Sequence, residues 1–111
     1  MMVSKSKKND PFQDIVKETI SSLQDRDMDN AGKLVTILVS MDMDAPEPHN
    51  LFGILSELKG NDDSARKHYR AAYALDPTYK PACRNLERLV LGTKSDGFDF
   101  GLAEIELADR G

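Results

Sequence analysis

The sequence lacks the features that mark disulfide-bonded, secreted or membrane-spanning proteins. Cys83 is its single cysteine, so no disulfide can form within the chain. No stretch approaches the roughly 20 consecutive apolar residues that span a bilayer. Lys5, Lys7 and Lys8 are not followed by an apolar run, so residues 1–9 are expected to be a disordered basic tail and neither a signal nor an anchor. We therefore expect a cytoplasmic protein without membrane contact.

Positive charge is also scarce. The chain has 15 Lys and Arg against 19 Asp and Glu, which gives a formal net charge of −4. A general nucleic-acid-binding protein needs a concentrated basic face, because it must neutralise phosphates. The sequence has no such face, so we predict no nucleic-acid partner.

The sequence offers no arrangement of residues suited to catalysis or metal binding. His49 and His68 are the only histidines, and with Cys83 as the single thiol they form neither a zinc-ligand pattern nor a nucleophile and base. The acidic run from Asp25 to Asn30 opens like a calcium loop but lacks the central glycine and the final glutamate, so we expect a capped turn. We predict no enzymatic activity, no cofactor and no bound metal.

What the sequence does contain is a series of amphipathic segments, which predicts an all-α fold. Apolar residues recur at helical spacing in segments at about 11–25, 30–41, 47–59, 63–75 and 79–91. Polar turns separate them, with Asp10, Asp29 or Asn30, and Asp62 or Asp63 as expected N-caps. Because the turns are short, neighbouring helices should be antiparallel.

The segment 30–41 differs from the others because apolar residues cover most of its circumference. Its β-branched run LVTILV would also fit a strand. We favour a helix, because the polar residues Lys33, Thr36 and Ser40 are spaced by three and four instead of two. A helix of this kind should be buried on several sides.

The segment from Pro46 to Tyr79 resembles a tetratricopeptide repeat. It is 34 residues long, which is the period of that family. Six positions agree in type at the right spacing, namely Gly53, Gly60, Ala65, Tyr69, Ala72 and Pro77. It departs from the family pattern at His49 and Ser56. Residues 12–45 are similar to a degenerate repeat. The segment that begins at Lys80 is similar to the first helix of a third repeat.

The resemblance implies antiparallel helical hairpins, stacked as a short right-handed superhelix of about five helices over residues 10–92. The family holds peptides on the concave side of such a stack, and the first helix of each pair lines that groove. The groove residues implied here are Val16, Ile20, Asn50, Ile54, Glu57, Lys80, Arg84 and Arg88. Such a groove is apolar at one end and basic at the other, so we expect a partner segment with acidic and apolar side chains.

Two alternatives at this groove stay open. Arg84 and Arg88 could equally be a solvated helix face. Asn50, Lys80 and Arg84 imitate part of the carboxylate clamp that some family members use. They sit one place early in the repeat, however, which rotates them by about 100° on a helix, so we expect no clamp.

Residues 93–111 form an acidic C-terminal tail or capping segment, in which Leu102 to Leu107 could be a short helix or extended. With Phe98, Asp99 and Phe100 it has the composition that the groove should bind, so it could lie in its own groove or a neighbour's. Alternatively, Phe98 and Phe100 cap the end of the last helix.

The function expected from these features is a protein–protein interaction module. The alternative is a structural or assembly subunit that associates through apolar helix surfaces, as a homodimer or in a larger complex. Chains of this length bury only about two thirds of their surface on folding, so a partner would add stability. The segment 30–41 distinguishes the two readings, because an exposed apolar surface on it favours assembly.

Overall fold

The computed structural model describes residues 10–110, and every regular element in this range is helical. The elements are α2 (Pro11–Gln24), α3 (Met28–Met41), α4 (Pro46–Leu58), α5 (Asp62–Leu75), α6 (Lys80–Leu91), the 3₁₀ turn η1 (Lys94–Asp96) and α7 (Leu102–Arg110). The predicted all-α class is confirmed, and the strand alternative for residues 30–41 is wrong because α3 covers them. The predicted basic tail, residues 1–9, lies outside the described residues.

The helices begin at caps that differ partly from those expected. Asp10 accepts hydrogen bonds from the backbone N–H groups of Phe12 and Gln13, as predicted for a cap before Pro11. For α3 and α5, however, the capping side chains are Asp27 and Asn61. The predicted caps are wrong there, because those residues lie in the first turn of each helix. The aspartates among them are instead stabilised by the positive end of the helix dipole.

The two helical hairpins, α2–α3 and α4–α5, turn in the same way at positions 34 residues apart. In the first, the N–H of Asp27 donates to the carbonyl of Ser22, and in the second the N–H of Asn61 donates to that of Ser56, both at 2.8 Å. The middle residues of the turns, Arg26 and Gly60, both have positive φ, 62° and 81°. The hairpin geometry therefore repeats with a period of 34 residues, although few letters of the sequence repeat.

Burial follows the same period. The buried residues of α3 are Ala31, Val35 and Leu38, and those of α5 are Ala65, Tyr69 and Ala72, each 34 positions later. All five residues buried in α2 have a buried counterpart at the same interval in α4; those of α2 are Val16, Thr19, Ile20, Ser22 and Leu23. Each hairpin thus presents equivalent faces to its neighbours, which is the packing of a helical repeat.

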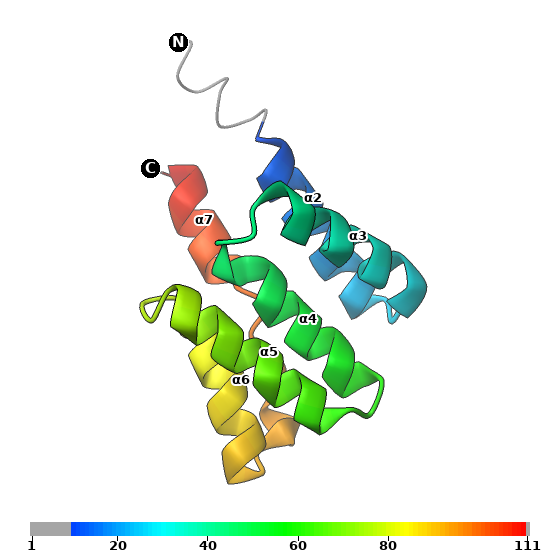
Figure 1. Ribbon diagram of the computed structural model, residues 1–111, viewed down its shortest axis with the longest axis vertical. Coiled ribbons are helices and arrows are strands. Elements are labelled where there is room, and N and C mark those ends of the chain that lie inside the picture. Colours follow the sequence, from blue (N-terminus) through cyan, green and yellow to red (C-terminus); the bar gives the residue numbers. More distant parts are fainter. Residues whose placement is uncertain (1–9, 111) are drawn as a thin grey trace.

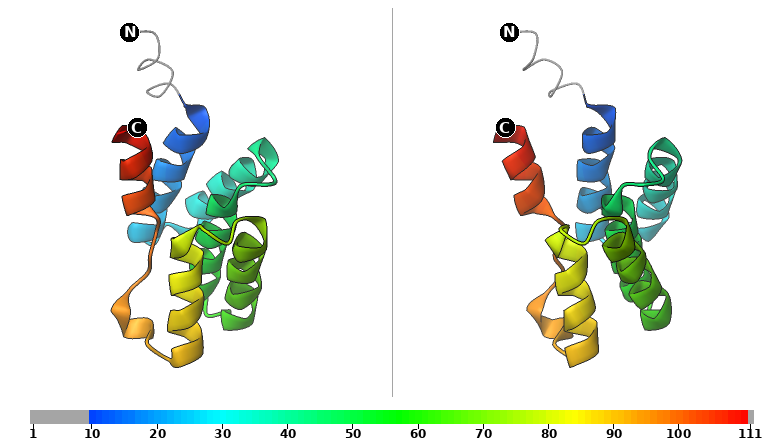
Figure 2. Two further views of the ribbon diagram at one scale, coloured as in Figure 1. Left: turned by 90° about the vertical axis from the view of Figure 1, so that its left-hand side faces the viewer. Right: turned by 60° about the vertical axis from the view of Figure 1, so that its left-hand side comes forward.

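The helices pack around α4, which contacts α2, α3, α5 and α6 (Figure 1). α2 and α4, the first helices of the two hairpins, and α6 lie side by side, with α4 in the middle. After α6 the chain turns back, and α7 comes to lie beside α2 (Figure 2). The last helix of the chain is therefore next to the first described one.

α4 and α5 approach each other closely at Gly53 of α4. A Cβ atom there would lie 2.3 Å from Cε1 of Tyr69, far inside van der Waals contact. The Tyr69 ring is fully buried, so it packs directly on the α4 backbone. Only glycine allows this contact.

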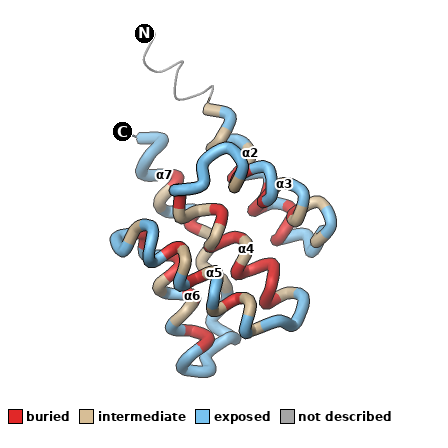
Figure 3. Tube along the Cα trace, in the orientation of Figure 1, coloured by how far each residue is buried: buried red, intermediate tan, exposed pale blue. Residues whose placement is uncertain are grey.

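α3 is less buried than its sequence predicts. Only Ala31, Val35 and Leu38 are fully buried, whereas Ile37 and Met41 are 44% and 42% exposed (Figure 3). The expectation of burial on several sides is wrong, because α3 packs on α2 and α4 along one side while its other side faces outward. An apolar strip therefore remains on the outer surface.

None of the helices between residues 10 and 110 is both long enough and apolar enough to cross a membrane.

Candidate partner-binding site

The apolar residues predicted to line a groove are buried in the core. Val16, Ile20 and Ile54 belong to one cluster that also contains Ile105 of α7, and Phe98 and Phe100 pack against it. The chain's own C-terminal segment thus occupies this face of α2, α4 and α6. The sequence left open whether the C-terminal segment lies against its own chain or a neighbouring one. In the structure it packs against its own chain and covers these apolar residues.

The segment that crosses this face is the linker, residues 97–101, which joins η1 to α7. Two asparagines hold its backbone at Asp99. The carbonyl of Asp99 accepts hydrogen bonds from Nδ2 of Asn50 (3.0 Å) and Nδ2 of Asn85 (2.8 Å). The N–H of Asp99 donates to Oδ1 of Asn85 (2.9 Å). Both backbone groups of one linker residue are thus satisfied by side chains from α4 and α6.

The asparagines also fix each other. Nδ2 of Asn85 donates to Oδ1 of Asn50 at 2.8 Å, and both side chains are fully buried. A buried amide without partners costs about 1–3 kcal/mol, so each asparagine needs the other and the linker backbone. The same geometry would suit the backbone of any extended chain in this position.

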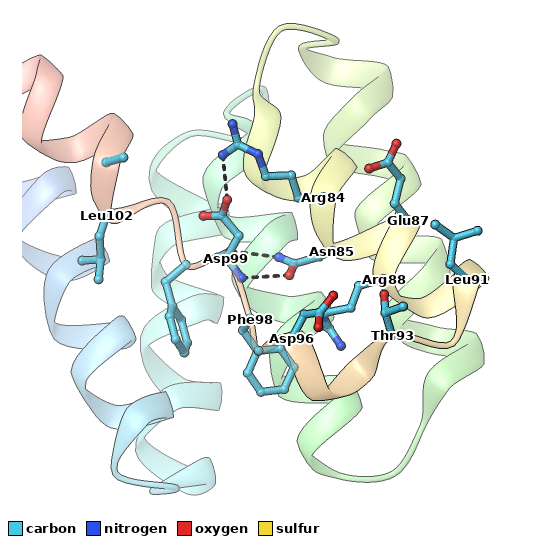
Figure 4. Close-up of a pocket in the computed structure, with 13 residues that line it drawn as sticks. Arg84, Asn85, Glu87, Arg88, Leu91, Thr93, Asp96, Phe98, Asp99 and Leu102 are labelled. Carbon is cyan, nitrogen blue, oxygen red and sulfur yellow. Dashed lines mark hydrogen bonds and ion pairs between the residues drawn. The ribbon is translucent and has the colours of Figure 1, made fainter.

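The Asp99 side chain reaches the surface and pairs with Arg84. Nη1 of Arg84 lies 2.8 Å from Oδ2 of Asp99 (Figure 4). The same atom lies 3.9 Å from Oε2 of Glu104. Hydrogen bonding to Asp99 raises the pKa of Arg84, so the guanidinium stays charged. Arg84 is 57% exposed, which makes the pair itself weak because solvent screens it.

Arg88 has a different role from the one predicted. It pairs with Glu57 of α4, and their side chains are only 5% and 2% exposed. Tyr69 donates its hydroxyl proton to the same Oε2 atom of Glu57, at 2.6 Å. Burial, followed by the contact with Glu57, raises the pKa of the Tyr69 hydroxyl, so it remains a donor. Glu57 and Arg88 therefore neutralise each other and are not free to bind a partner's charges.

Arg88 also contacts the linker through Phe98. Its guanidinium carbon lies 4.7 Å from the centroid of the Phe98 ring, within the range of a cation–π contact. Phe98 in turn packs edge to face on Phe100, with the ring centroids 5.9 Å apart. The linker therefore places two aromatic rings on the core, on either side of the Asp99 backbone.

We call Asn50, Arg84, Asn85 and Arg88 the linker site. Arg84, Asn85 and Arg88 also line a pocket of about 600 Å³ between α6 and residues 96–103 (Figure 4). Leu91 and Leu102 line it together with Phe98 and Arg84, so its wall combines apolar surface with an accessible cation. Lys80, the remaining predicted groove residue, is exposed at the start of α6 and lies outside this network.

Asn85 is the linker-site residue that sequence reasoning missed. It lies three positions after Ala82 and four before Leu89, so it falls on the buried stripe of α6. An asparagine on an apolar stripe is a signal that could have found it, because such a residue must have hydrogen-bond partners when it is buried. Its spacing from Asn50 is 35 residues, one more than the repeat period, which hid the pair.

A histidine pair between α4 and α5 links stability to pH. His49 and His68 stack at 5.9 Å between ring centroids, and Phe52 stacks on His68 at 4.5 Å. Burial lowers the pKa of both histidines from the usual 6.5, and for His68 the neighbouring His49 lowers it further. Around and below pH 6.5 the unfolded chain therefore binds more protons than the folded one, so the free energy of unfolding decreases as the pH falls through this range.

We expect the melting temperature to fall between pH 7.5 and 5.5, and to fall less in the His68→Gln variant. Thermal unfolding followed by circular dichroism across this range checks both. Glu47 acts in the opposite direction, because burial raises its pKa, so the comparison between chains isolates the histidine contribution. Equal pH dependence in both chains would rule out this role of His68.

Among residues 10–110, no three His, Cys, Asp or Glu side chains cluster as a metal site would require. A scan against protein-family models, a search of curated proteins and a search of solved structures each found no match. No family assignment follows from them.

Proposed function

We propose that this chain is a protein–protein interaction module of the tetratricopeptide-repeat type, and that its linker site holds an extended segment of a partner protein. The observation that supports the proposal is the pair of buried asparagines from α4 and α6 that hydrogen-bond the backbone of Asp99. Side chains that bind backbone groups can hold an extended chain with little regard to its sequence. The 34-residue period of the hairpin turns supports the family resemblance. The cytoplasmic location stays a prediction.

A test of this proposal has to remove the linker first. The linker and a partner would use the same groups, so a change at the linker site weakens both and need not reduce partner capture by the intact chain. Asp99→Pro removes the N–H that binds Asn85 and the carboxylate that binds Arg84, while the site on α4 and α6 stays intact. We call this the released variant.

We expect the released variant to retain more partner from cell extract than the unchanged chain. Adding Arg84→Glu to it should reduce capture of that partner at least tenfold, because the exposed cation is reversed. The matched control is Arg70→Glu in the released variant, which reverses an exposed charge on α5, away from the linker site. Quantitative mass spectrometry of the bound fraction measures all four chains. Equal capture with and without Arg84→Glu would contradict the proposal.

The second candidate function is assembly through α3, and the exposure of its outer side favours it. Ile37 and Met41 lie one turn apart and are about half exposed, and Met43 beyond them is 73% exposed. If this strip joins two copies or a larger complex, sedimentation at micromolar concentration should give more than one chain. The Ile37→Asp, Met41→Asp variant should then sediment as a single chain. A monomer before and after the change would leave no support for self-association.

A further inference from the structure

The linker contacts define a sequence pattern as well as a backbone position. Phe98 stacks on Arg88, the Asp99 carboxylate pairs with Arg84, and Phe100 packs on the core. Gly101 follows with a φ of +86°, and a Cβ there would lie 2.5 Å from the Tyr79 hydroxyl. The site therefore accommodates an aromatic residue, Asp, an aromatic residue and Gly in that order, and rejects larger residues at the fourth position.

The chain leading into the linker is held only weakly. Residues 92–97 are all exposed, and Gly92 and Gly97 both have positive φ. The long-range contact of this stretch is an ion pair between Lys94 and Asp62, whose side chains are 50% and 38% exposed. Such exposed pairs contribute at most about 1 kcal/mol. The stretch before the linker therefore adds little to its hold, which rests on the contacts of residues 98–101 and on Ile105 of α7 in the core.

A competing segment of another chain can make its first contact in the pocket next to α6. Arg84 faces it and is largely accessible while Asp99 is still bound. An acidic side chain from another chain can reach Arg84 there before the linker leaves, and the aromatic neighbours can then follow into the apolar wall formed by Leu91 and Leu102. Exchange by such steps avoids leaving the buried asparagines unpaired.

We infer that the ligand of the linker site is a partner segment with the pattern aromatic–Asp–aromatic–Gly, and that the linker is a built-in competitor for it. This rests on the proposed function. Because the linker is tethered by a few residues, its effective concentration is on the order of millimolar. A partner must outcompete that concentration, so binding by the intact chain is weaker than the site itself allows.

The test uses a fluorescein-labelled peptide with the sequence of residues 96–110, titrated by anisotropy against full-length chains. We expect the released variant to bind it at least tenfold more tightly than the unchanged chain. Two control peptides carry a lysine in place of Asp99 or an alanine in place of Gly101, and each should bind at least tenfold more weakly. Circular dichroism shows whether the released variant keeps its helices.

The peptide titrations distinguish competition by the linker, the ligand pattern and the proposed function. Equal affinity of the two chains for the peptide would show that the linker does not compete. Equal affinity of all three peptides would overturn the ligand pattern. Failure of a folded released variant to bind any peptide, while it still captures a partner through Arg84, would also overturn the pattern but leave the proposed function standing.

A measurement on the unchanged chain covers the case in which the released variant does not fold. Excess unlabelled peptide is added to ¹⁵N-labelled protein, and amide signals are followed by NMR. The backbone N–H groups of Asp99 and Gly101 are hydrogen-bonded in the docked linker, so their signals should shift and exchange faster with solvent as the peptide displaces them. Signals of α3 should not change. Unaffected signals at Asp99 and Gly101 under saturating peptide would overturn the inference.

Discussion

Replacing Arg88 by methionine is expected to lower the free energy of unfolding by about 3–5 kcal/mol, because it leaves the Glu57 carboxylate buried without its counter-ion. This is a large part of the roughly 5–15 kcal/mol that a small domain has in total. The variant should therefore unfold at much lower urea concentration, with an unchanged slope of the transition. Urea titration followed by circular dichroism measures the difference.

Two further chains test the origin of that loss. In the Glu57→Gln, Arg88→Met double variant no charge is buried, and the amide can still accept the Tyr69 hydroxyl, so we expect it to be more stable than Arg88→Met alone. The pair leaves Oε1 of Glu57 and Nε of Arg88 without a hydrogen bond among the described residues, so the native pair is itself imperfectly satisfied. Arg84→Met, an exposed change on the same helix, should cost at most about 1 kcal/mol. A double variant as unstable as the sum of its single changes would contradict the explanation.

Gly53→Ala should destabilise the protein by about 1–3 kcal/mol, because the added methyl group overlaps the buried Tyr69 ring and must push α4 and α5 apart. The ring cannot move aside, since it is fully buried and its hydroxyl is bound to Glu57. Thermal and urea unfolding measure the loss.

Gly32→Ala is the matched control for this prediction. It makes the same substitution inside α3, where the nearest atom to the new Cβ would be Cδ2 of Leu55 at 3.8 Å, an ordinary contact. Alanine is the better helix former by about 1 kcal/mol, so Gly32→Ala should stabilise the protein. The two changes are expected to have opposite signs, and a similar effect of both would mean that the contact with Tyr69 is not what decides the result.

The helices were predictable because their apolar spacing and turn residues agree. The caps of α3 and α5 were less so, since each turn contains several polar residues that could cap, and the choice depends on where the tight turn closes. The predicted burial of α3 failed for a related reason. An all-round apolar sequence shows how many neighbours a helix could have, but not how many the fold provides, and Ile37 and Met41 remain outside.

The site was predictable in part. Asn50 and Arg84, two of the residues predicted to line a groove, contact the linker, whereas the groove itself stays a prediction. Arg88 was assigned to a partner because its own partner, Glu57, is 31 residues away on another helix. The linker position could not be derived from sequence, because its contacts with Asn50 span 49 residues and depend on how three helices are arranged.

The return of α7 to α2 ties the two ends of the helical array together. An open array of hairpins can lose its end units one at a time. Here Lys17 of α2 meets Asp109 of α7 across 92 residues, and Ile105 is buried in the same core as Val16. Neither end can then separate without disturbing the other, so the molecule should melt in one cooperative step. It should also fold more slowly than its helical content implies, because its closing contacts join the most distant parts of the described chain.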